Sequence, residues 1–154
     1  MFELTIKGVV YQFNFGMGFL RALNKKVGTP VDGIPDVKKN IGLRYKLAGL
    51  FDSDLEDLTE ILLTANMGQS PRLSADLLDY YIDNECEDID ALFAEVIDFL
   101  KNVNATKKTM NELLAQNTGK PLKTIEKDTD RDNFMTAEEA LAYGLVDKIL
   151  AKRP

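Results

Sequence analysis

The amino-acid sequence predicts an α+β fold, with an N-terminal β-hairpin packed on a mainly helical bundle and a small C-terminal helix-helix-strand appendage. Three observations support this prediction. Apolar and polar residues alternate over residues 1–15, and apolar residues recur at helical spacing over residues 17–100. Glycines and prolines then divide residues 119–150 into short elements. A hydrophobic fraction of 45% is enough for a packed core.

The hairpin is predicted from the alternation at the start of the chain. Phe2, Leu4 and Ile6 alternate with polar residues, which is the period-two pattern of a half-buried strand. Gly8 interrupts the pattern, and residues 9–15 (VVYQFNF) resume it. The sequence therefore predicts two strands joined by a tight turn.

The bundle is predicted from five helical stretches. They cover residues 17–27, 41–50, 54–65 and 75–83, and a longer stretch that begins at Asp88 or Asp90 and reaches residue 100. Ser74 is the predicted N-cap of the fourth, whose buried stripe is expected to be Leu77, Leu78, Tyr81 and Ile82. Residues 28–40 hold two prolines and two glycines and are predicted to be a loop, and a helix break is predicted at residues 102–106.

The appendage is predicted from its turn and capping residues. Gly119 ends a helix, and Pro121 takes the first position of the next one. Thr136 and Glu139 have the spacing of a capping box for a further helix, which Gly144 ends. The stretch LVDKIL that follows is predicted to be a last short strand.

Composition excludes several classes of function. The net charge of −6, with most of the acid excess in residues 1–109, argues against nucleic-acid binding. The chain has no histidine, so Ser-His-Asp and Cys-His catalysis and histidine-based zinc sites are excluded. The GMG at residues 16–18 lacks the third glycine of a dinucleotide loop. We therefore expect no cofactor, no bound metal and no enzymatic activity.

Cysteine content and the first residues indicate the compartment. Cys86 is the only cysteine, so no intramolecular disulfide can form and a reducing compartment is the simpler interpretation. Glu3 and Lys7 interrupt the segment where a signal peptide would be apolar, and no apolar run approaches the ~20 residues that span a bilayer. The expected location is the cytoplasm, away from membranes.

The aspartate run DTDRDNF allows three interpretations. As an EF-hand loop, Asp128, Asp130 and Asp132 would occupy positions 1, 3 and 5, with Glu139 at position 12. Asn133 stands where that loop needs glycine, and Glu139 is already assigned to the capping box. The other interpretations are a protease acid and a polar turn between two helices, of which the polar turn is favoured.

The protease interpretation comes from a resemblance. Residues 110–150, through NELLAQNTG, DTDRDNF, AEEA and YGLVDKIL, resemble the C-terminal segment of the Clp protease proteolytic subunit, ClpP. In that family the aspartate at the position of Asp132 orients the catalytic histidine. No histidine is present here, and the MGQS of residues 67–70 only echoes the nucleophile segment. The resemblance therefore implies a catalytically incomplete segment, with a degenerate peptidase subunit or a calcium binder as alternatives.

Residues 1–109 resemble a second family, the tail assembly chaperones of siphophages and prophages of Gram-positive bacteria. The resemblance is carried by FELTIKGVVYQFNFGMGFLRALNKK, NIGLRYKLAGL, DLEDLTEILLTAN, PRLSADLLDYYIDN and DIDALFAEVIDFLKNVNATKKTM. It implies a non-enzymatic, self-associating protein that coats the tape measure protein during tail assembly. In many phages a frameshifted form also recruits the tail tube protein.

The two resemblances predict a chaperone-like domain at residues 1–109 and a ClpP-like segment at residues 110–154, joined by a natural gene fusion or by design. The candidates for client contact are the exposed members of Phe15, Met17, Phe19, Leu43, Tyr45, Tyr80 and Tyr81, although most residues of such a stripe are expected to be core. The apolar residues Leu113, Leu114, Ile125, Leu141 and Leu145 must either dock on other helices or remain loosely ordered.

Overall fold

The fold of the chain is given by a computed structural model, which describes residues 1–130 and 134–149. The predicted α+β class is confirmed, and the chain divides into two compact units, residues 1–106 and 107–154. We call them the N-terminal unit and the C-terminal unit. The division predicted after residue 109 concerns the two family resemblances and stays a prediction.

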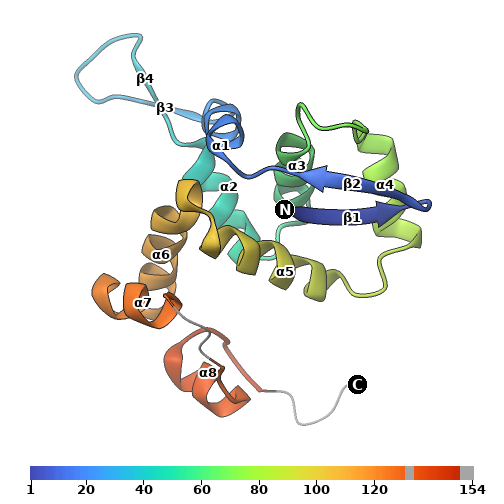
Figure 1. Cartoon of the computed structure of the whole chain (residues 1–154). Helices are drawn as coiled ribbons and strands as arrows, with labels where there is room; N and C mark the ends of the chain where they lie inside the picture. Colours follow the sequence, from blue (N-terminus) through green and yellow to red (C-terminus); the bar gives the residue numbers. More distant parts are fainter. Residues whose placement is uncertain (131–133, 150–154) are drawn as a thin grey trace. The chain divides into compact units, whose positions relative to one another are not determined.

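The N-terminal unit holds four strands and five complete helices (Figure 1). In chain order they are β1 (Phe2–Ile6), β2 (Val9–Phe13), α1 (Met17–Asn24), β3 (Gly28–Pro30), β4 (Lys38–Asn40), α2 (Gly42–Phe51), α3 (Leu55–Ala65), α4 (Ala75–Asn84) and α5 (Ile89–Asn102). Helix α6 (Asn104–Thr118) begins in this unit, and α7 (Leu122–Thr129) and α8 (Ala137–Tyr143) follow in the C-terminal unit.

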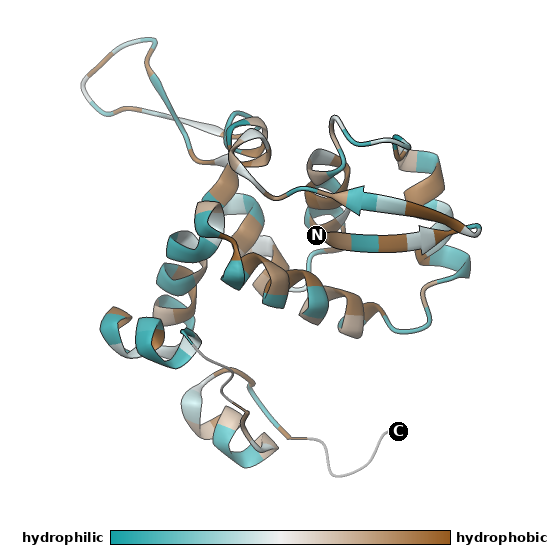
Figure 2. Cartoon of the chain, viewed as in Figure 1, coloured by the Kyte–Doolittle hydropathy of each residue, from teal (hydrophilic) through white to brown (hydrophobic). Residues whose placement is uncertain are grey.

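The predicted hairpin is confirmed. β1 and β2 pair antiparallel with Phe2 opposite Phe13, and every second residue of β1 is buried. Figure 2 shows the same alternation of hydrophobic and hydrophilic residues along β1. Lys7 and Gly8 both have positive φ, 49° and 75°, as a two-residue type I′ turn requires, and Gly8 adopts this conformation without steric cost.

Aromatic residues join the hairpin to the helices. The rings of Phe2, Phe15 and Phe99 lie within 6.1 Å of one another, and Phe13 and Phe19 extend the cluster. Because Phe19 belongs to α1 and Phe99 to α5, this cluster connects the hairpin with the helix that follows it and with one far along the chain. Edge-to-face pairs of this kind add to the stabilisation that burial provides.

Helices α1, α2 and α3 pack against one another. α2 approaches α1 at Gly42, where an added Cβ would lie 2.0 Å from the backbone oxygen of Leu23. Only glycine fits such an approach.

The next three helices each begin at a side-chain N-cap. The side chains of Asp54, Ser74 and Asp88 accept a backbone N–H at the start of α3, α4 and α5. This confirms the predicted cap at Ser74 and places the start of α5 at Asp88, not at Asp90.

The stripe predicted for α4 is wrong in extent. Of its four residues only Leu78 is buried, while Leu77, Tyr81 and Ile82 are half-buried. The reason is that the main packing partners of α4, α3 and β1, cover this face of the helix only in part.

A partly buried ionic network joins α2 to α3. Lys46 Nζ lies 2.7 Å from Asp57 Oδ1 and also forms an ion pair with Glu60. Glu60 forms a second ion pair, in which its Oε1 lies 2.8 Å from Lys26 Nζ. The hydrogen bonds that Lys46 donates to the carboxylates of Asp57 and Glu60 raise its pKa above the ordinary value. Burial alone would raise the pKa of Glu60, but hydrogen bonds from Lys26 and Lys46 lower it. Both shifts show that the charged forms are stabilised in the fold.

Asn66, at the end of α3, is a fully buried polar residue with every hydrogen bond made inside the unit. Its side-chain amide donates to the backbone oxygen of Gln12 at 2.9 Å, and its side-chain oxygen accepts the N–H of Leu73 at 2.6 Å. It therefore ties β2, α3 and the segment before α4 together.

Residues 28–40, predicted to be a loop, contain two short strands instead. β3 and β4 pair antiparallel, with Gly28 opposite Asn40. The ladder continues on both sides, because the Ile41 N–H donates to the Val27 oxygen at 2.9 Å and the Val31 N–H donates to the Val37 oxygen at 3.0 Å. Backbone pairing between Gly28–Pro30 and Lys38–Asn40 needs no apolar alternation, so the sequence pattern does not reveal it. We call residues 28–40 the arm.

The predicted break after α5 is confirmed at Val103, which has extended backbone. Thr106, which is fully buried, donates its hydroxyl to the Leu100 oxygen at 2.6 Å and so caps the end of α5. The side chain satisfies a carbonyl that the broken helix leaves without a partner.

In the C-terminal unit, Met110, Leu113, Leu114 and Ile125 are buried, whereas Leu141 and Leu145 are exposed at 40% and 47%. The predicted capping box of Thr136 and Glu139 is confirmed, as is the end of α8 at Gly144 with φ 89°.

Two predictions for this unit are wrong. Pro121 is the N-cap of α7 and not its first residue, because its ψ of 140° is not helical. The strand predicted in LVDKIL does not form over its described residues 145–149, which pair with no described strand. A single extended segment without a partner leaves its backbone groups to water and does not form a strand.

Candidate partner-binding surfaces

The aspartate run does not form a site in the described residues. Asp132 lies outside them. Asp128 accepts the Tyr143 hydroxyl at 2.6 Å, Asp130 lies 3.5 Å from Lys107 Nζ, and Glu139 closes the capping box. Burial and then the hydrogen bond to Asp128 raise the pKa of Tyr143 to about 12. Within residues 1–130 and 134–149, no three His, Cys, Asp or Glu side chains converge as a metal site would require.

The seven residues predicted as client candidates divide by burial. Phe15, Phe19 and Leu43 belong to the core, as expected for most of such a set. Met17 and Tyr45 are exposed at 53% and 57% and stay candidates. Tyr80 and Tyr81 are half-buried, and Lys7 Nζ lies 3.7 Å from the ring centre of Tyr80.

The first candidate surface is a groove of about 340 Å³ between the start of α1 and the end of α3. Two exposed methionines, Met17 and Met67, line the groove. Gly16, Gly18 and Gly68 also line it and have no side chain to fill it. None of its lining residues is charged: they are Asn14, Gly16, Met17, Gly18, Phe19, Ala22, Thr64, Met67 and Gly68. We call it the methionine groove. Methionine side chains adapt their shape to different apolar partners.

Sequence reasoning found Met17 but missed Met67, which is exposed at 55%. The two residues are 50 positions apart in the sequence. They meet because α1 and α3 run side by side, with the Asn14 N–H donating to the Ala65 oxygen at 2.8 Å. No local pattern around Met67 indicates this pairing.

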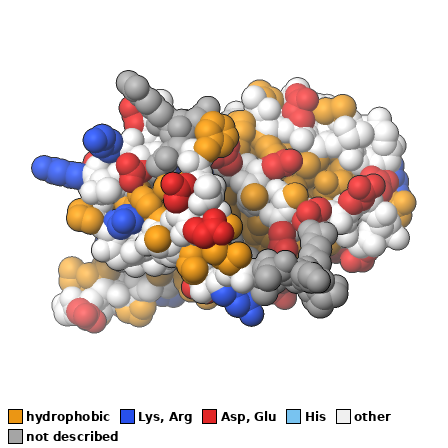
Figure 3. Space-filling model, turned by 90° about the horizontal axis from the view of Figure 1, so that it is seen from below, with side chains coloured by type: hydrophobic (Ala, Val, Ile, Leu, Met, Phe, Trp, Pro, Cys, Tyr) orange, Lys and Arg blue, Asp and Glu red, His pale blue; other side chains and the backbone are white. Residues whose placement is uncertain are grey.

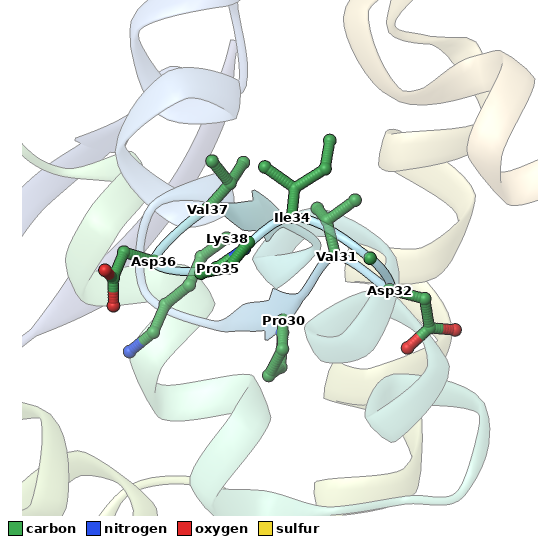
Figure 4. A pocket seen from close by; sticks show the side chains of 9 residues that line it. Pro30, Val31, Asp32, Ile34, Pro35, Asp36, Val37 and Lys38 are labelled. Atoms are coloured by element: carbon green, nitrogen blue, oxygen red, sulfur yellow. The ribbon is translucent and has the colours of Figure 1, made fainter.

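The second candidate surface is the arm, which extends away from the helices of the N-terminal unit (Figure 1). Val31, Ile34 and Val37 project from the same side of it in Figure 4, and Ile34 and Val37 are exposed at 53% and 46%. The loop between the strands encloses a hollow of about 540 Å³. Backbone hydrogen bonds from Ile34 to Val31 and from Val37 to Ile34 hold its shape.

The third candidate surface is acidic. Residues 73–100, which include α4 and most of α5, contain nine Asp or Glu and no Lys or Arg. In contrast, residues 21–46 contain seven Lys or Arg and two Asp. On the face drawn in Figure 3, acidic side chains are spread among apolar ones. The N-terminal unit therefore carries its positive and negative charges on different elements.

These surfaces suit contact with other proteins, and comparison with known families gives the context. The model of the phage tail assembly chaperone protein family, TAC, matches residues 3–114. The chain belongs to this family. The match covers the whole N-terminal unit except its first two residues and includes all three candidate surfaces.

Membership in the tail assembly chaperone family confirms the resemblance of residues 1–109 and assigns the chain a chaperone role in phage tail assembly. The family is in general non-enzymatic. The match continues to Leu114, through the first five residues of the segment that resembles ClpP, and the ClpP resemblance stays a prediction. No solved structure matches the chain. No helix within the described residues is long and apolar enough to cross a membrane.

Proposed function

We propose that this tail assembly chaperone binds the tape measure protein in the cytoplasm of the bacterial host and keeps it soluble until the tail tube forms around it. The observation that carries the proposal is the family match over residues 3–114. The resemblance implies a long, aggregation-prone client, and a chaperone of a helical client needs apolar surface that accepts a helix.

The methionine groove is the surface we assign to this client. Its glycines allow a helix to approach the backbone closely, and Met17 and Met67 can close over the apolar face of that helix. The absence of charge among its lining residues favours an apolar stripe over a charged one. The net charge of −6 then keeps the complex soluble.

Coating a long client takes several copies, so we propose that the chain also self-associates along it. Recruitment of the tail tube protein is part of the same proposal, for a form of the protein that carries the additional domain.

Co-expression with the tape measure protein of the same phage or prophage tests the proposal. We expect a higher soluble yield of the client and a complex that co-purifies with it. Absence of a complex with the cognate client would contradict the proposal.

The site is tested by a double variant, Met17→Lys with Met67→Lys, which places two charges in the groove. We expect it to lose the complex while the chain stays folded by circular dichroism. The matched control is Leu141→Lys with Leu145→Lys, two exposed aliphatic residues at 40% and 47% that lie outside the family match. Equal binding by both double variants would exclude the groove but not the function.

A further inference from the structure

The charges of the N-terminal unit are divided between two ends. At one end lies the segment from α4 to the start of α5, together with the β1–β2 turn; at the other lie the arm and α1 (Figure 1). We call these the acidic end and the basic end. Residues 75–90 at the acidic end hold seven acidic residues and no base, and the turn adds one base, Lys7, whereas residues 17–40 at the basic end hold five bases and two acids.

The charges of the acidic end are exposed, and most of them have no partner. Asp76, Asp79, Asp83, Glu87 and Asp90 are all exposed, and no described lysine or arginine pairs with them. Of the other two, Glu85 accepts the backbone N–H of Lys7 at 3.0 Å, and Asp88 caps α5. Like charges held this close repel one another, so a cationic partner would relieve the repulsion.

The basic end carries exposed cations that its own acids do not neutralise. Arg21, Lys25, Lys38 and Lys39 are exposed, and none pairs with a described carboxylate. Lys26 and Lys46, in contrast, are bound to Glu60. The two acids of this region, Asp32 and Asp36, lie in the loop between β3 and β4, beyond the lysines of β4.

Each end also exposes aliphatic side chains beside its charges. The basic end has Ile34 and Val37, exposed at 53% and 46%, on one side of the arm (Figure 4). The acidic end has Val9 and Val10, exposed at 44% and 46%, next to the β1–β2 turn. An apolar contact supplies the affinity that exposed ion pairs lack, and the charges fix its orientation.

We propose that the basic end of one copy docks on the acidic end of a second copy. Side chains alternate along β4, so Lys39 lies on the side of the arm that carries Ile34 and Val37, opposite Lys38, and it is Lys39 that faces Asp79 and Asp83. The occupant of each end is therefore another copy of this chain. Because the two surfaces differ, the contact is head-to-tail and leaves one free end on each side of any pair. Such a contact adds copies one after another, which suits the coating of a long client. The inference specifies how the proposed self-association occurs.

Sedimentation of the purified full chain without a client tests this. The weight-average mass is expected to rise with protein concentration beyond that of a dimer, and the association to weaken at least tenfold at about 0.5 M salt. A chain that stays monomeric, or that stops at a dimer, would overturn the proposal.

Charge reversal separates head-to-tail docking from other contacts. Lys38→Glu with Lys39→Glu, and Asp79→Lys with Asp83→Lys, should each abolish association alone. Mixing the two variants should restore it, because each retains the end that the other lacks. The matched control, Lys108→Glu with Lys123→Glu, changes the same charge at exposed residues of the C-terminal unit and should associate like the unaltered chain.

Failure of the mixture to associate, or an equal loss in the control, would refute docking between these ends. No client takes part in the experiment, so such a failure leaves the proposed binding of the tape measure protein unaffected. Conversely, a chain that associates head-to-tail but binds no client would support only the present inference.

Discussion

The two compact units of the chain are stabilised in different ways. The N-terminal unit buries 21 apolar residues, whereas the described part of the C-terminal unit buries four, and α8 buries none. Burial of apolar surface is the main favourable term in folding, so most of the stability must reside in the N-terminal unit. That unit also contains all three candidate binding surfaces, which need a rigid support.

Both units enclose polar groups, and in the C-terminal unit the buried Asn111 accepts the Thr129 hydroxyl at 3.0 Å. The N-terminal unit encloses Asp57 and Asn66, and each has its partners from another part of the unit. The described hydrogen bonds of α8 are mostly local, from Thr136 and Glu139 at its start and Gly144 at its end, and the Tyr143 hydroxyl adds one to Asp128. A helix held by its own caps opens independently, whereas a helix held by long-range partners opens only with the unit.

The largest contrast is expected from core truncation. Leu62→Ala removes a fully buried side chain of α3 and should lower the free energy of unfolding by about 3 kcal/mol. Leu141→Ala, at a residue exposed by 40%, should change it by less than about 0.5 kcal/mol. Urea unfolding of both variants measures the difference. Similar losses would show that the two units contribute equally to stability.

A second contrast lies within the ionic network of the N-terminal unit. Lys46→Met leaves Asp57, whose side chain is exposed by 10%, without its cation and should cost about 3 kcal/mol. Lys26→Met breaks a more exposed pair and should cost less than about 1 kcal/mol. Because the pKa of Lys46 is raised, its contribution is complete below pH 10.5 and is lost as the pH increases beyond that value.

The contribution of Glu60, an acid of the same network, to stability depends on pH in the opposite direction. The lowered pKa of Glu60 gives a contribution that is present above pH 4.5 and is lost as the pH falls below it. Urea unfolding across both pH ranges checks both directions. A stability that is unchanged in Lys46→Met at neutral pH would contradict the role of the network.

Removing one N-cap in each unit compares cooperative with local opening. Ser74→Ala and Thr136→Ala each delete a side-chain acceptor and should cost about 1 kcal/mol. For Ser74 the loss should appear in global unfolding, while for Thr136 it should appear only as faster hydrogen exchange in α8. Loss of protection throughout the chain in Thr136→Ala would show that α8 is part of the cooperative core.

The smallest expected effect concerns Tyr143 and Asp128, a contact within the C-terminal unit. Asp128→Asn removes the carboxylate that holds the hydroxyl and should lower the pKa of Tyr143 from about 12 toward its ordinary 10. Because the folded pKa is raised, the contribution to stability is complete below pH 10 and decreases as the pH rises toward 12. Spectrophotometric titration of tyrosinate checks the shift, and an unchanged titration would exclude the contact.

The family and most of the secondary structure could be predicted from the sequence because their causes are local. The alternation in residues 2–6, the cap at Ser74 and the box at Thr136 each depend on neighbours within a few residues. Where a pattern needed a distant strand as its partner, the prediction was wrong: LVDKIL has the composition of a strand but pairs with no described strand. The strands of the arm were missed because backbone pairing gives them no apolar signature.

By itself, the sequence determined the absence of an imidazole, the hairpin, the order of the helices and the concentration of acidic residues in 73–100. Only the tertiary structure decided which apolar residues reach the surface. It buried Phe15, Phe19 and Leu43, left Met17 exposed and brought Met67 beside it. The physical reason is that periodicity specifies the face of a helix, but whether that face meets protein or water depends on how helices distant in the sequence pack together.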